Sequence, residues 1–394
     1  ARNSMYTHDV SGTATSADGN TAYGFGALDA ITGGDLNTVV GHLAGSAINS
    51  GSNNVLMGYA TGDALTTGSD NVAIGYAALS VEDTGAKNVA IGKSALNALN
   101  FDGDGYNVAV GYNAGTAVTL GKENTLIGGQ AGDSLTTGEK NIAIGKAALS
   151  TEDTGSRNVA VGHGALQTLN YDGTSYNVAV GYDAGVNVTT GIRNTLIGAG
   201  TGDALTTGGY NVAIGHFALS AEDTHGTNVA IGYTALYTLD AGTDAYNVAV
   251  GFEAGVAMTT GIQNTLLGGL AGDALTTGSY NIAIGFEALS TEDTGGRNTA
   301  VGFGALKFAN YDGNAYNVAI GFGAGTAVTT GQANVLMGGL AGYNLTTGHY
   351  NVAIGMQALE SEDANGRNVA IGQEALQTLN AGADGYNTAV GFQA

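Results

Sequence analysis

The sequence has no Cys, no Pro and no Trp among its 394 residues, and it has few basic residues. Without Cys, the chain can form neither a disulfide framework nor a CxxC-type metal or redox site. Only 11 Lys and Arg oppose 33 Asp and Glu, which gives a formal net charge of -22. This balance argues against nucleic acid or an anionic membrane as a partner, because both attract basic clusters. No apolar run approaches the roughly 18–20 residues of a membrane helix, so we do not expect membrane insertion.

The chain contains instead a pentad that begins with Asn and ends with Gly, as in Asn-Val-Ala-Ile-Gly, and that occurs 22 times. Successive Asn residues lie 17 or 19 positions apart, and from Asn71 the steps 17, 19, 17 and 17 close into a repeat of 70 residues. Self-similarity at a short fixed period is typical of solenoids. We therefore predict an all-β parallel solenoid (a β-roll) of 22 coils over residues 20–394, preceded by an irregular connection in residues 1–19.

Positions within a coil are numbered here from its Asn. Position 1 is always Asn and position 5 is always Gly. We expect the Asn side chains to stack in a hydrogen-bonded ladder and the Gly residues to turn the chain with positive φ. Positions 2 to 4 favour a short strand, and the Ala typical of position 8 predicts a second one. Ladder residues from the first full 70-residue repeat are Asn71, Gly75, Asn88, Gly92, Asn107, Gly111, Asn124 and Gly128.

Position 3 is apolar in every coil, although it alternates with apolar or Thr residues at positions 2 and 4. A thin coil has only one interior, so the second face of the strand should pack against another molecule. The simplest partner is a second copy of the chain, and we expect a parallel homotrimer, with a head-to-tail filament of single solenoids as the main alternative. The residues expected near the contact are Ala73, Ala143, Ala213 and Ala283.

The pentads Asn71–Gly75 and Asn158–Gly162, each followed by x-x-Ala, resemble the head repeats of trimeric autotransporter adhesins. The unit that begins at Asn194 is similar to Gly-rich repeats of bacteriophage tail fibres. Both resemblances cover about residues 20–394 and imply parallel β-rolls in trimeric, extracellular proteins. The coils here are longer than the adhesin head coil, which favours the tail-fibre shaft.

Three recurring groups of side chains are candidates for chemistry or binding. Glu-Asp pairs recur every 70 residues, beginning with Glu82-Asp83, and we interpret them as solvated turns with ion pairs to a following Lys or Arg. Asp-rich loops precede the coils that follow a 19-residue step, and the first loop, with Asp102 and Asp104, suggests calcium as an alternative to a plain Asp-Gly turn. These loops end in Tyr residues that could stack on sugar rings. The possible ligand contacts are Tyr106, Tyr176, Tyr246 and Tyr316.

Every reactive group that stands out belongs to the repeat, and an active site has no reason to recur at a fixed period. The six His residues occupy variable positions and show no metal-ligand spacing. The sequence therefore predicts a structural protein that is not an enzyme and needs no cofactor: the shaft of an extracellular fibre, from a virion or a cell surface. The alternatives are an adhesin that binds host glycan or protein along the shaft, and a self-polymerising surface filament.

Overall fold

The computed structural model describes residues 5–6 and 16–394, and the chain divides into two compact units, Ala1–Asn194 and Thr195–Ala394. All regular elements of the described residues are β-strands, and successive strands pair in parallel within each unit. The predicted all-β parallel solenoid is therefore confirmed. No helix long and apolar enough to span a membrane occurs in the described part of the chain.

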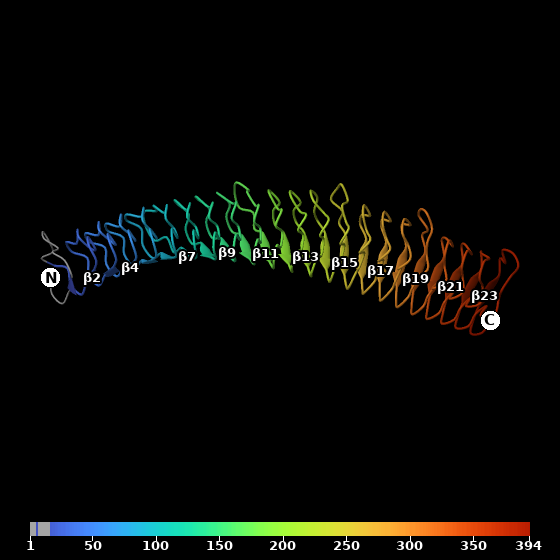
Figure 1. The fold of residues 1–394 in the computed structure, drawn as a ribbon. Helices are drawn as coiled ribbons and strands as arrows, with labels where there is room; N and C mark the ends of the chain where they lie inside the picture. The colour runs from blue at the N-terminus through green and yellow to red at the C-terminus, as the bar shows by residue number, and fades with distance from the viewer. Residues whose placement is uncertain (1–4, 7–15) are drawn as a thin grey trace. The chain divides into compact units, whose positions relative to one another are not determined.

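The strands are short, and each coil contributes one of them (Figure 1). In the first unit they are β1 Met5–Tyr6, β2 Thr21–Tyr23, β3 Thr38–Val40, β4 Val55–Met57, β5 Val72–Ile74, β6 Val89–Ile91, β7 Val108–Val110, β8 Thr125–Ile127, β9 Ile142–Ile144, β10 Val159–Val161 and β11 Val178–Val180. In the second unit they are β12 Thr195–Ile197, β13 Val212–Ile214, β14 Val229–Ile231, β15 Val248–Val250, β16 Thr265–Leu267, β17 Ile282–Ile284, β18 Thr299–Val301, β19 Val318–Ile320, β20 Val335–Met337, β21 Val352–Ile354, β22 Val369–Ile371 and β23 Thr388–Val390.

The Asn side chains fix the register of successive coils. The Oδ1 atom of Asn71 accepts a hydrogen bond from the backbone N–H of Asn88 at 3.0 Å, and its Nδ2 atom donates to the carbonyl of Gly85 at 2.9 Å. Asn107 and Asn124 continue the same pattern. These Asn residues are buried, so a shift in register would leave buried polar groups without partners. Strand residues at equal positions consequently lie side by side, as Val72 does with Val89.

Gly at position 5 is required by both backbone conformation and space. The φ of Gly75 is 135°, a value that L side chains rarely adopt. A Cβ atom on Gly75 would lie 2.4 Å from the carbonyl oxygen of Gly92, the equivalent residue one coil further along. Gly92, Gly111 and Gly128 meet the same two constraints.

The strand faces are reversed relative to the sequence-based expectation. Position 3 lies inside each coil, and the side chains of positions 2 and 4 point outward. Ala73, Ala143, Ala213 and Ala283 are fully buried within the single chain, so they cannot form the expected contact between copies. Every fourth coil has Leu at position 3, and there the Leu side chain fills the space above a Gly at position 9. Leu126, for example, would contact a Cβ atom placed on Gly132 at 2.8 Å.

The predicted second strand does not form. Residues from position 6 to position 9 make turns instead, because positions 7 and 9 have left-handed backbone conformations. In the coil of Asn71, Ala77 has a φ of 49° and Leu79 a φ of 53°. The Ala at position 8 is buried between them, as Ala78 shows. A second difference lies before the first coil, where Met5–Tyr6 pairs in parallel with Thr21 and Ala22 inside the segment expected to be irregular.

Two Gly-to-Ala substitutions test the steric requirement at position 5. We expect Gly75→Ala to lower the free energy of unfolding by about 2 kcal/mol or more, because the new methyl group strains φ and meets backbone atoms of the next coil. Gly129→Ala is the matched control, since its Cβ atom would meet no atom within 4 Å and its φ is not positive. Denaturant midpoints of the two variants provide the comparison, and equal midpoints would contradict this account.

Candidate functional site

The Glu-Asp pairs form a buried anchor rather than the expected solvated turn. Glu82 is fully buried, and its carboxylate accepts hydrogen bonds from the backbone N–H of Gly85 at 2.6 Å and of Phe101 at 3.1 Å. Phe101 opens the inserted loop of the next coil, so Glu82 joins its own turn to that loop. Four equivalent residues make the same pair of contacts, with some variation in distance: Glu152, Glu222, Glu292 and Glu362.

Burial makes these carboxyl groups weaker acids than an exposed Glu. Loss of hydration raises the pKa of Glu82, Glu152 and Glu292 above the ordinary value of 4.5, and the backbone N–H donors oppose this increase. A raised pKa and a neighbouring Asp also occur in enzymes that use paired carboxylates. Here, however, both oxygens accept backbone hydrogen bonds in every repeat, so we assign these Glu residues to loop attachment.

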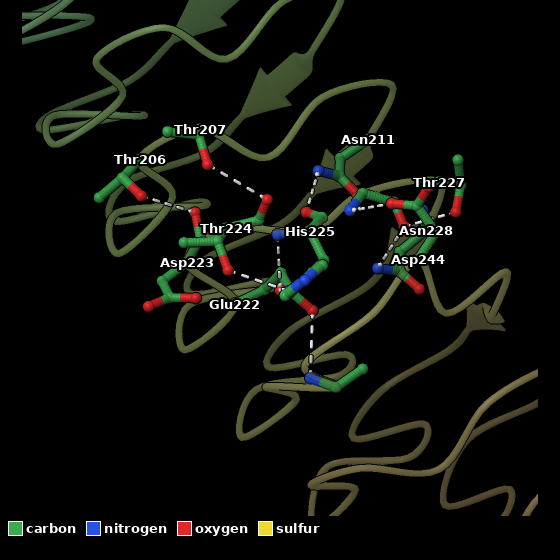
Figure 2. Close-up of polar contacts among 12 residues, drawn as sticks. Thr206, Thr207, Asn211, Glu222, Asp223, Thr224, His225, Thr227, Asn228 and Asp244 are labelled. Carbon is green, nitrogen blue, oxygen red and sulfur yellow. Dashed lines mark hydrogen bonds and ion pairs between the residues drawn. The ribbon is translucent and has the colours of Figure 1, made fainter.

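The third repeat differs because His225 replaces the Gly found at residues 85, 155 and 295. Figure 2 shows its ring beside Glu222, whose Oε1 atom lies 3.8 Å from Nδ1 of His225. Glu222, Asp223 and His225 are the one group among the described residues whose ligand atoms are close enough together to hold a metal ion. The Glu222 oxygens already accept the N–H groups of His225 and Ala241, and Thr224 contacts the His ring at 3.0 Å. The cluster is thus a variant of the same anchor.

The Asp residues of the inserted loop have partners in their own chain. Asp102 accepts a hydrogen bond from the hydroxyl of Thr84 at 2.6 Å, and Asp104 pairs with Nζ of Lys87 at 2.7 Å. This hydrogen bond from Lys87 lowers the pKa of Asp104. The two carboxylates suggested as calcium ligands are therefore engaged separately. The basic residue of the repeat also differs from expectation, because Lys87 pairs with the loop of the next coil rather than with Asp83.

The Tyr residues that end the inserted loops are exposed, and most of them contact a cation of the preceding coil. Nζ of Lys87 lies 5.2 Å from the ring centre of Tyr106. The guanidinium carbon of Arg157 lies 5.7 Å from the ring centre of Tyr176, and its Nη1 atom donates to the Tyr hydroxyl at 3.0 Å. Tyr316 receives Arg297 in the same way. Tyr246 differs, because residue 227 is Thr where the other repeats have Lys or Arg.

A column of stacked rings at position 6 was not recognised from the sequence. Phe25, His42, Tyr59 and Tyr76 stack in succession with ring centres 5.2–5.6 Å apart. Shorter stacks follow at other coils: His163 with Tyr182, His216 with Tyr233 and Phe252, and Phe286 with Phe303 and Phe322. The position-6 rings stack along their own column, from one coil to the next. Three of the His residues thus belong to this column, whereas His8 lies outside the described residues.

No protein family matches the sequence, and no curated protein matches it significantly.

The buried Glu residues predict a pH dependence of stability. A carboxyl group whose folded-state pKa is raised favours the fold while protonated, and this contribution is lost as the pH rises from about 4.5 through the raised pKa. We therefore expect replacement of Glu82, Glu152 and Glu292 by Gln to reduce the loss of stability over this range. Unfolding midpoints of native and substituted protein from pH 4 upward measure the difference. Parallel pH profiles would show that these groups do not titrate with folding.

Proposed function

We propose that the protein is a non-catalytic structural shaft of an extracellular fibre, in which copies of the chain lie side by side and space a receptor-binding tip from its base. The proposal rests on one observation, the outward face of the strands. Positions 2 and 4 of β2–β23 carry only Val, Ile, Leu, Met, Thr and one Tyr, without a charged side chain. In a chain with a net charge of -22, an uncharged, regular surface of this kind favours contact with another protein.

The outward side chains are partly exposed in the single chain. Ile142 and Ile144 of β9 retain 38% and 36% of their accessible surface. Full burial of such a side chain stabilises by about 1.5–3 kcal/mol, so covering the exposed third contributes about 0.5–1 kcal/mol. The ten strands β2–β11 present two outward side chains each. Most of the other outward side chains are less exposed than these two Ile residues, and three of them are Thr, so their sum is on the order of 10 kcal/mol or less, which is comparable to the roughly 4–15 kcal/mol that association costs.

A second copy of the chain is the partner that matches this surface best. Its outward residues recur with the same period, so equivalent columns of Val and Ile can meet at every coil. A partner without this period would match a few coils at most. A parallel homotrimer, as the sequence resemblance implies, thus retains its support, but its contact involves positions 2 and 4 rather than the Ala residues of position 3.

Charged substitutions on the outward face test this assembly. We expect replacement of Ile142, Ile144, Ile282 and Ile284 by Glu to shift the protein toward single chains, because unpaired charges in an apolar contact are costly. The fold should persist, since these side chains already reach solvent. Glu at the exposed turn residues Thr67 and Thr137 provides the control. Sedimentation equilibrium gives the mass, and a native protein of 39.0 kDa would refute lateral assembly.

The exposed aromatic side chains favour an adhesin as the second candidate function. Near β18 and β19, Phe303, Phe308, Phe322 and Tyr343 surround a hollow of about 280 Å³, together with Lys307. Exposed rings next to polar groups are suited to sugars or to protein side chains. A self-polymerising filament is distinguished from both by its concentration-dependent growth in length.

A glycan array separates a passive shaft from an adhesin. For the shaft we expect no saturable binding by the isolated protein at micromolar concentration. Strong binding that is abolished by Tyr106→Ala with Tyr176→Ala, Tyr246→Ala and Tyr316→Ala would favour the adhesin. Binding abolished instead by Phe303→Ala with Phe322→Ala would place the receptor site at the hollow, again against a passive role.

A further inference from the structure

The residue before the Asn of the second coil in each 70-residue repeat has the same backbone conformation in all five copies. These residues are Lys87, Arg157, Thr227, Arg297 and Arg367, with φ between 61° and 66°. Each donates its backbone N–H to a carbonyl one coil earlier, at 3.1 Å for Thr227 and Arg297 alike. Their side chains therefore leave the backbone in the same direction, and the five copies differ in the group that they present.

Two of the repeats hold a guanidinium group between two Tyr rings. The guanidinium carbon of Arg297 lies 5.3 Å from the ring centre of Tyr280 and 5.6 Å from that of Tyr316. In the fifth repeat, Arg367 lies 5.7 Å from Tyr350 and 5.4 Å from Tyr386. The third repeat retains both rings, as Tyr210 and Tyr246, but presents Thr227 between them in sequence. The aromatic surroundings are thus conserved within the chain where the cation is not.

The fifth and third repeats also have an Asp carboxylate at the same place. Oδ1 of Asp384 accepts the backbone N–H of Gly366 at 3.0 Å, and Oδ2 pairs with Arg367. Asp244 is the equivalent residue, and its Oδ1 accepts the N–H of Gly226 at 3.1 Å. Figure 2 shows Thr227 and Asp244 in this part of the third repeat. Within the described residues, Asp244 forms no ion pair that corresponds to the one between Asp384 and Arg367, because Thr227 carries no charge.

We propose that Asp244 and Tyr246 form a binding site for the guanidinium group of an arginine side chain supplied by another molecule. Asp244 Oδ2 would accept its hydrogen bonds, and its planar face would lie against the Tyr246 ring, as the chain's own Arg residues lie in the other repeats. Arginine is favoured over lysine because three of the four basic residues at this position of the repeat are Arg, and because a planar guanidinium group can stack on a ring face. The inference does not depend on the proposed fibre function.

The site is exposed, and Tyr246 retains 57% of its accessible surface. Cation–π contacts and ion pairs at exposed positions are weak, so the dissociation constant for an isolated arginine is expected to be on the order of tens of millimolar or more. Several such residues on one partner would be needed for tight binding. Weak affinity makes NMR titration the suitable measurement.

The test uses the full chain with ¹³C-labelled Tyr at 0.15 M salt, and Nα-acetyl-argininamide as the probe. The signal of Tyr246, identified by its loss in Tyr246→Phe, should shift saturably, while that of Tyr316 should not respond. The citrulline analogue of the probe, which is neutral, should cause no shift. Asp244→Asn should weaken binding about threefold or more, because the ion pair is lost.

Two further variants exchange the residues of the repeats. Thr227→Arg introduces the residue of the other copies, so it should fill the site from within and abolish the response of Tyr246. Arg367→Thr should create a second site, detected at Tyr386 next to Asp384. The proposal is overturned if Tyr246 does not respond in the native chain, if it responds equally in Thr227→Arg, or if Arg367→Thr leaves Tyr386 unresponsive to the probe.

Discussion

The hydrogen bond that the backbone N–H of each Asn donates to the side-chain oxygen of the preceding Asn is the interaction on which this structure depends. It joins coils 17 or 19 residues apart, and in most coils the Nδ2 atom of the same side chain closes its own coil through a backbone carbonyl, as Asn71 does with Gly85. Strand register, burial of the third strand position and the close approach of the Gly residues all follow from it. Each inserted loop must bring the chain back so that the next Asn lies beside the preceding one. The buried Glu carboxylates hold the backbone at the start of this loop in place.

The repeat and the all-β solenoid could be predicted because the fold needs Asn and Gly at fixed positions. The interior could not be assigned from alternation, since both faces of each strand are apolar. A more informative signal was present: in every fourth coil, Leu at position 3 accompanies Gly at position 9, as Leu126 accompanies Gly132. Such size compensation is typical of a close-packed interior. The second strand was wrongly predicted because positive φ at non-Gly residues such as Ala77 is rarely apparent from sequence.

The candidate sites were only partly predictable for a related reason. The sequence identified Glu82, Asp104 and Tyr106 as recurring groups, but their partners lie one coil away, at separations of 17 to 19 residues. Closeness in the sequence therefore led to the wrong prediction that Lys87 pairs with Asp83. Once the coils are aligned, each copy serves as a reference for the others, and departures such as His225 and Thr227 identify places where selection for the fold alone does not fix the residue.

The direction of the inter-coil hydrogen bonds has a mechanical consequence. Within each unit these bonds run from coil to coil, so a pull applied to one end peels the bonds of the terminal coil while the remaining coils stay intact. Each event releases 17 or 19 residues, which extend by about 60 Å when stretched. A tether built in this way would lengthen in small, nearly equal increments under tension, and it would absorb work at each step instead of failing at once.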